Sequence, residues 1–258
     1  MTIKVLSTLR SYGKRVEQRL YLIKWSVPRK KHDTGYTAHI LLVKNPTNLH
    51  IAKVSVASFL YHNPGSRVVI HCDQDTKCKA SKVFSFFIKK NSVQIVQLEN
   101  QYGELQLQKI ELLEKISHNE KNFYMDYVLK WAGRLDLPEK CIFYISEFKL
   151  IDKSPFKELL LGINLEEEEI EMLNTAFVYL YPGNFDQKDL VQLREMYNKI
   201  EKACNSGIVA KLDREVVMRL SEQIGFSIFL ANSGREHRPL ITESSRSDIN
   251  YLRPVVSI

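Results

Sequence analysis

Three acidic side chains follow predicted strands, and they are the residues best placed to bind a phosphorylated ligand. Asp73 and Asp75 come after one β-branched run, and Glu147 follows Ser146 after the apolar run 140–145. In open α/β sheets, ligands gather beyond the carboxyl ends of the strands, where loops and helix N-termini converge. A hard divalent cation on a diphosphate needs one or two carboxylates, whereas the alternative role of each acid is to cap the next helix. We expect these acids to converge on one crevice that accepts a diphosphate.

Other familiar ligand motifs do not occur in the sequence. The ten glycines are widely spread, and there is no GxGxxG, no GxxxxGK[ST] and no GxSxG. Dinucleotide dehydrogenases, P-loop enzymes and α/β-hydrolases are therefore not favoured. The histidines stand singly, and only His71 is close in sequence to the acids of the expected crevice.

Strand-like and helical stretches alternate over residues 36–232, which is typical of an α/β protein. Short runs of branched apolar residues predict buried strands, and apolar positions at steps of three and four predict helices. We expect a mixed, mostly parallel sheet flanked by helices, with a polar loop at 73–76. The expected strands are 36–43, 67–72, 93–98, 140–145 and 175–181, and the expected helices are 49–61, 78–89, 104–117, 122–134, 190–204 and 217–231.

The positive charge of the chain is concentrated in its first residues. The formal net charge is +7, from 37 basic and 30 acidic side chains. Residues 1–31 hold nine of the bases and a single acid, Glu17, so the other 227 residues hold 28 bases and 29 acids. The high isoelectric point is therefore a property of a leader and not of the whole fold.

This leader also contains apolar side chains, so it is predicted to be either a basic amphipathic helix on an anionic membrane or partner, or a solvated helix or tail. Nucleic acid is not expected as a partner, because the rest of the chain has no second basic stripe. No apolar run approaches the eighteen or so residues of a membrane span, and no signal peptide is recognisable. We expect a cytoplasmic protein, located at the inner face of the membrane in the case that the leader binds lipid. The expected organisation is a basic segment at 1–34, an α/β domain at 35–232 and a tail or lid at 233–258.

The four cysteines, Cys72, Cys78, Cys141 and Cys204, are scattered along the chain. They form no CxxC pair and have no HxxxH partner, so neither a structural zinc site nor a disulfide framework is predicted. Reduced, partly buried thiols are expected.

The order of these segments resembles the GT-A glycosyltransferases, in particular bacterial nucleotide-sugar transferases. The matching segments are His39–Val43, Ser58–Leu60, Val69–Asp73, Asp126–Trp131, 140–155, Asn174–Phe177 and Ser221–Phe226. In that family a polar residue of the first strand lies near the donor, and a helix, here Asp126–Trp131, leads to the metal-site strand. The strand that begins at Asn174 resembles the one beside the acceptor site, and the Glu222-Gln223 pair resembles the one that opens the last helix.

The resemblance implies a nucleotide-sugar donor and a glycan or lipid acceptor. Glu222 and Glu147 are the catalytic candidates that it implies. The candidates for donor binding are His39, Asp73, Asp75, Asp126, Ser146, Asn174 and Gln223.

The sequence departs from the family at the metal motif. These transferases usually carry Asp-x-Asp after the strand, and counting back from Pro155 aligns that motif with Ser146-Glu147-Phe148. Both aspartates are then missing, so no metal ligand is assigned. The charge of the leaving diphosphate would be neutralised by a manganese or magnesium ion on Glu147 in a shifted register, or by Lys149, Arg235 or Arg238.

Three hypotheses remain open on the sequence. The first is an active, metal-independent sugar transferase in which Glu222 is a base or orients the acceptor. The second is a transferase-like fold without catalysis that serves as a binding or scaffold protein. The third is an unrelated α/β protein whose leader binds membranes or nucleic acid.

Overall fold

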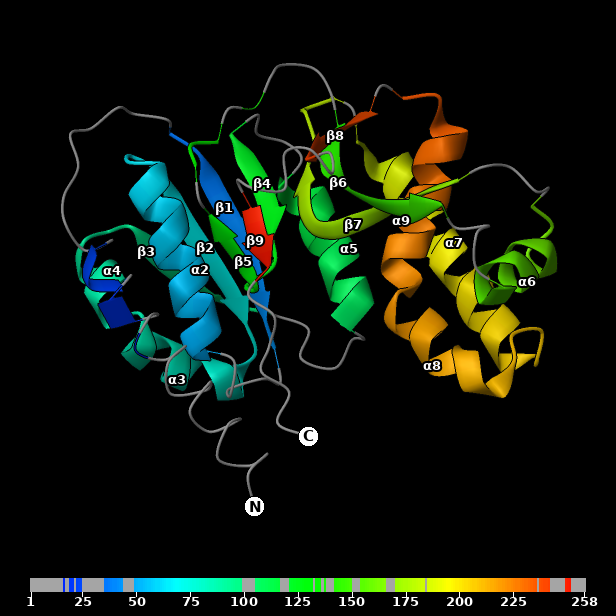
Figure 1. The fold of residues 1–258 in the computed structure, drawn as a ribbon, viewed down its shortest axis with the longest axis horizontal. Coiled ribbons are helices and arrows are strands. Elements are labelled where there is room, and N and C mark those ends of the chain that lie inside the picture. The colour runs from blue at the N-terminus through cyan, green and yellow to red at the C-terminus, as the bar shows by residue number, and fades with distance from the viewer. Residues whose placement is uncertain are drawn as a thin grey trace. The chain divides into compact units, whose positions relative to one another are not determined.

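The computed structural model divides into two compact units (Figure 1). Unit 1 is formed by Met1–Gln101, Asp126–Leu137 and Ser245–Ile258, and unit 2 by Tyr102–Met125 and Pro138–Ser244. The residues that the structure describes are 16, 19, 20, 22–24, 35–43, 49–98, 105–116, 121–131, 133–135, 137, 142–149, 154–165, 170–183, 185–235, 237–241 and 249–251.

In the described part of unit 1, parallel strands lie in the order β3-β2-β1. Their bounds are β1 (Thr37–Leu42), β2 (Arg67–Cys72) and β3 (Val93–Gln97), and the helices between them are α2 (Leu49–His62), α3 (Gln74–Val83) and α4 (Ser85–Lys89). The side chains of β1 from Ala38 to Leu42 are buried, as expected for a parallel strand with both faces covered. These three strands and α2 confirm the sequence prediction.

A small antiparallel pair completes unit 1. Strand β5 (Leu129–Trp131) pairs with β9 (Ile249–Tyr251). Helix α2 holds β5 through Ser58, whose Oγ accepts a hydrogen bond from the Trp131 backbone N–H at 3.0 Å. The predicted helix at 122–134 is wrong: its apolar residues belong to two short strands that are separated by a turn after Asp126. Apolar spacing alone did not distinguish two short strands from a helix.

In the described part of unit 2, the strands lie in the order β4-β7-β6-β8. Their bounds are β4 (Asn122–Met125), β6 (Ile142–Lys149), β7 (Glu171–Tyr179) and β8 (His237–Ile241). Strand β7 is antiparallel to β4 and β6, whereas β8 is parallel to β6. Strands β8 and β9 lie in the stretch after 233, where we expected no strand.

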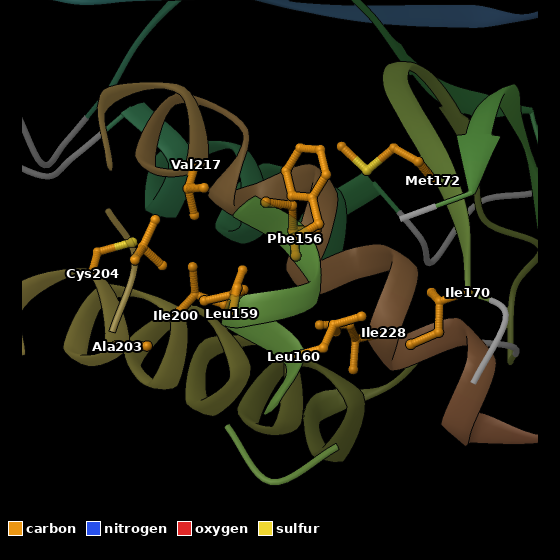
Figure 2. Packing of buried hydrophobic residues seen from close by; sticks show 12 residues of the cluster. Phe156, Leu159, Leu160, Ile170, Met172, Ile200, Ala203, Cys204, Val217 and Ile228 are labelled. Carbon is orange, nitrogen blue, oxygen red and sulfur yellow. The ribbon is translucent and has the colours of Figure 1, made fainter. Parts of the chain in front are cut away.

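The helices of unit 2 contribute buried apolar side chains to its core. They are α5 (Leu105–Ile116), α6 (Ser154–Gly162), α7 (Gln187–Asn205), α8 (Lys211–Arg219) and α9 (Ser221–Ser233). Figure 2 shows Leu159 and Leu160 of α6 beside Ile200 of α7 and Ile228 of α9. The predicted apolar stripe 190–204 is confirmed, since its residues are buried along α7. The expected helix at 217–231 is two helices that meet at Leu220, and Ala231 is exposed.

Parallel pairs in both units and antiparallel pairs in unit 2 give the mixed, mostly parallel α/β architecture expected from the sequence. Helices pack on the strands in each unit, for example α3 on β3 and α9 on β7. The predicted fold class is therefore confirmed.

Candidate functional site

Glu222 forms a buried ion pair in unit 2. It lies in the first turn of α9, where the partial positive charge of the helix N-terminus favours a carboxylate. Its Oε1 is 2.7 Å from Lys109 Nζ, and each of the two side chains is only 8% exposed. Two opposite charges in a dry site need close geometry and further hydrogen bonds, since otherwise desolvation outweighs their attraction.

Thr175 provides those further hydrogen bonds. Its Oγ1 accepts a bond of 2.9 Å from Lys109 Nζ and donates a short one to Glu222 Oε1. Thr175 and Lys109 both contact Oε1, and among the described residues no contact to Oε2 is observed. One oxygen of the carboxylate is therefore fixed, and the other can accept a hydrogen bond from a ligand hydroxyl.

Strand β7 presents Thr175 to α9 at an irregular point of the sheet. The pairing of β6 with β7 moves from Tyr144↔Val178 to Ile145↔Asn174. Asn174 Oδ1 accepts a hydrogen bond from the Ala176 backbone N–H at 2.8 Å, which stabilises this local conformation. The Leu173 backbone N–H donates to Ser227 Oγ of α9 at 3.0 Å, which ties strand and helix together. Asn174 therefore supports the backbone beside Thr175.

Lys109 comes from the middle of α5 and was not among the predicted site residues. Its Nζ also lies 4.6 Å from the centre of the Tyr124 ring of β4, a cation–π contact. In the sequence, Lys109 resembles any charged position of an amphipathic helix, and only the fold brings it to Glu222. Gln223, predicted with Glu222, is half-buried one position further along α9.

Asp73 and Asp75 belong to unit 1 and lie at the start of a helix. Asp73 is the N-cap of α3, and its Oδ1 accepts a hydrogen bond from the Thr76 backbone N–H at 2.7 Å. Asp75 lies in the first helical turn. The predicted polar loop at 73–76 is therefore wrong, because the cap lets the helix begin at Gln74 and not at Cys78.

His39 of β1 contacts His71 of β2, the histidine expected near the acids. His39 Nδ1 and His71 Nε2 are 3.0 Å apart, and the two rings stack with their centres 5.3 Å apart. One imidazole therefore donates to the other. His39 is 9% exposed, so it belongs to the interior of unit 1.

Cys72, between His71 and Asp73, is a free and buried thiol. Burial, together with the nearby Asp73 carboxylate, raises its pKa to about 11. Cys204 is also free and buried, and burial raises its pKa, whereas Cys78 is free and exposed. Cys141 lies outside the described residues. The buried thiols are protonated at neutral pH and are therefore poor nucleophiles.

Ser146 and Glu147 lie within strand β6 of unit 2 and not in a loop after it, which corrects the prediction. The strand extends to Lys149 because its pairing with β7 continues past Ser146↔Leu173 to Phe148↔Met172. Glu147 has no partner in this register, which is typical of a β-bulge. The side chains of 142–149 lie outside the described part of the structure. Asp126, another predicted donor residue, lies in unit 1 before β5, in a turn closed by the Leu129 N–H to Asp126 C=O bond of 3.3 Å.

Arg235 is bound by an acid of its own unit. Its Nη2 lies 2.7 Å from Asp189 Oδ1 and 2.6 Å from Oδ2. This pair ties the chain after Gly234, the left-handed C-cap of α9, to the first turn of α7. Arg235 is therefore engaged by a carboxylate, and the side chains of the other two candidate cations, Lys149 and Arg238, lie outside the described part.

The described residues contain neither a metal-binding cluster nor a membrane-spanning helix. No group of three or more His, Cys, Asp or Glu side chains within them is arranged to hold a metal ion. No helix among them is long and apolar enough to span a bilayer.

Comparison with known proteins gives matches at the level of structure. No family model matches the sequence, and no curated protein matches it significantly. The galactosyltransferase LgtC, in complex with donor and acceptor sugar analogues, aligns with a TM-score of 0.50 and 12% identity over 78% of this chain and 72% of its own. An active-site mutant of LgtC gives a TM-score of 0.50 and 9% identity over 74% and 70%. Mouse xyloside xylosyltransferase 1 gives 0.45 and 12% over 83% and 90%.

The chain thus has the mixed α/β fold of the GT-A-like glycosyltransferases. At this level of identity the likeness establishes the fold alone.

Proposed function

We propose that this protein transfers a sugar from a nucleotide-sugar donor to a glycan or lipid acceptor, without a bound metal ion. The proposal rests on one observation: Glu222 is buried and fixed through one oxygen by Lys109 and Thr175, in a fold that known sugar transferases share. A carboxylate so held keeps its second oxygen for a sugar hydroxyl. In this proposal Glu222 orients or deprotonates the reacting hydroxyl, and Gln223 and Asn174 bind the donor.

The alternative is that the Lys109–Glu222 ion pair has a purely structural role and that the protein is an inactive scaffold. A buried pair can contribute to the fold without any chemistry, and removal of one partner then costs about 3–5 kcal/mol. The two roles differ in what they predict for a change that removes the charge but keeps the shape.

The test is Glu222→Gln in the full-length chain. Gln keeps an oxygen that accepts from Thr175, so the variant is expected to fold with lower stability because Lys109 loses its counter-charge. Release of nucleoside diphosphate from a panel of nucleotide-sugars is measured with and without EDTA. Loss of a general base or a positioning group is expected to lower turnover by about 10²–10⁴-fold, while EDTA leaves the activity of the unaltered protein unchanged.

The matched control is Glu111→Gln. Glu111 lies on the same helix as Lys109 and forms a half-exposed pair with Arg194 at 2.9 Å. The control receives the same chemical change in unit 2 and is expected to keep full turnover. Equal turnover in Glu222→Gln and in the control would reject the catalytic role.

A second variant covers the case in which Glu222→Gln does not fold. Thr175→Val removes the hydroxyl but leaves both charges, and it is expected to fold and to lower turnover through the lost alignment of the carboxylate. No turnover by the unaltered protein with any nucleotide-sugar, together with tight nucleotide binding, would favour the scaffold. Activity abolished by EDTA and restored by manganese would overturn the metal-free part of the proposal and favour a metal on Glu147.

A further inference from the structure

An apolar stripe is exposed on the described part of the leader. Residues 16, 19, 20 and 22–24 have helical backbone. Val16, Leu20 and Ile23 are 42%, 62% and 68% exposed, and the last two are the most exposed large apolar side chains among the described residues. At about 100° per residue, these three positions fall within an arc of about 60° on one face of a helix. Such a stripe in water is unfavourable unless a partner covers it.

Two bases flank this stripe. Arg19 and Lys24 are both exposed, and on the same wheel each lies about 40° beyond one edge of the stripe. Long basic side chains in these positions can follow an apolar surface while their charged ends remain at its polar boundary. The arrangement matches a helix that lies in the plane of a membrane interface.

The charge of the leader selects the kind of surface. Residues 1–31 hold nine bases and one acid, whereas the rest of the chain is nearly neutral. An anionic lipid surface attracts such a basic segment. The apolar stripe can be buried at the boundary between the lipid headgroups and the acyl chains. A nucleic acid would satisfy the charge alone and would leave Val16, Leu20 and Ile23 in water.

We infer that the stripe Val16, Leu20 and Ile23, with Arg19 and Lys24 at its edges, binds the surface of an anionic lipid bilayer as an in-plane helix. This inference is independent of the proposed sugar transfer. It places the protein on the surface where a lipid acceptor would be presented.

The experiment is flotation of the full-length chain with two kinds of vesicle, one of pure phosphatidylcholine and one an equal mixture of phosphatidylcholine and phosphatidylserine. The unaltered protein is expected to float with the mixed vesicles and much less with the neutral ones. The double variant Arg19→Ala, Lys24→Ala is expected to bind the mixed vesicles about thirtyfold more weakly, since each base contributes about one kcal/mol near an anionic surface. Leu20→Asp with Ile23→Asp is expected to weaken binding more than about a hundredfold.

The matched control is Val191→Asp with Lys199→Ala on α7. Val191 is 46% exposed and Lys199 is exposed, so the control makes changes of the same kind on another exposed helix. It is expected to float like the unaltered protein, and circular dichroism checks that every variant is folded.

Three outcomes would overturn the inference. The first is the absence of flotation with the mixed vesicles. The second is equal flotation with both kinds of vesicle. The third is undiminished flotation of the Leu20→Asp, Ile23→Asp variant. The leader would then bind the vesicles through charge alone, in the way that it would bind a soluble polyanion.

Discussion

Asp73 shows how one carboxylate can be assigned to either of two roles. Its cap hydrogen bond to Thr76 explains why α3 begins at Gln74, whereas the resemblance assigns it to the donor. Asp73→Ala is expected to lower the free energy of unfolding by about 1 kcal/mol, and Asp73→Asn to keep most of the stability because Asn is an equally good N-cap. Denaturant unfolding of the two variants measures this difference.

The same pair of variants tests donor binding. If the negative charge of Asp73 takes part, Asp73→Asn loses the stabilisation by nucleotide although its helix remains capped. Equal nucleotide binding in Asp73→Asn and in the unaltered protein would exclude a contribution of the Asp73 charge to donor binding and would support its role as a helix cap. Equal stability of the Ala and Asn variants would contradict the cap.

The acids of the candidate site could be chosen from the sequence, but their partners could not. Glu222 was selected because the Glu222-Gln223 pair resembles the one that opens the last helix of the GT-A glycosyltransferases, and the structure places it in the first turn of α9. Lys109 carried no comparable signal, because a lysine in a helix is an ordinary surface residue. Thr175 belongs to the Asn174–Phe177 segment of the resemblance, but as a threonine in a strand it was not singled out. Their role arises from a contact between α5, β7 and α9, which no local pattern contains.

Elements with strong local signals were predicted well, and those that depend on distant pairing were not. Strand β2 was predicted with its observed bounds, because its branched residues lie between Gly65 and the polar residues 73–76. Strands β4 and β5 were mistaken for a helix, since each is short and is completed by a partner far along the chain, Val178 for Tyr124 and Tyr251 for Leu129. Strand β8, which was not predicted, pairs in parallel with β6. The local periodicity of the sequence does not predict pairing between strands that are far apart in the chain.

Helix α7 depends on a capping box that titrates. Asp186 accepts hydrogen bonds from the Lys188 and Asp189 N–H groups at 2.7 and 3.1 Å, and the Asp186 N–H donates to Asp189 Oδ2 at 2.7 Å. The bonds from the Asp189 and Lys188 N–H groups lower the pKa of Asp186 below its ordinary value. A lowered pKa stabilises the fold at a pH above the pKa of the unfolded chain, which is about 3.9, and this contribution is lost as the pH falls through the folded-state pKa.

Asp186→Asn isolates this titration, because Asn caps a helix but does not ionise. The difference in Tm between the unaltered protein and the variant is expected to be constant from neutral pH to about pH 5 and to shrink below about pH 4. Thermal unfolding followed by circular dichroism measures it. A difference that stays constant down to about pH 3 would show that Asp186 caps α7 without a contribution from its charge.

The stability of the complete chain reports on ligand binding without any assumption about the acceptor. A ligand that binds only the native state at a hundred times its Kd adds about 2.7 kcal/mol to the free energy of unfolding. For a chain of this size that corresponds to a rise in Tm of about 5–10 °C. We expect nucleoside diphosphates and nucleotide-sugars to give such a rise, with little further gain from manganese, since the resemblance aligns Ser146 and Phe148 with the aspartates that usually bind the metal. A rise that requires manganese would place a metal beside Glu147, and no rise with any nucleotide would reject nucleotide-sugar binding altogether.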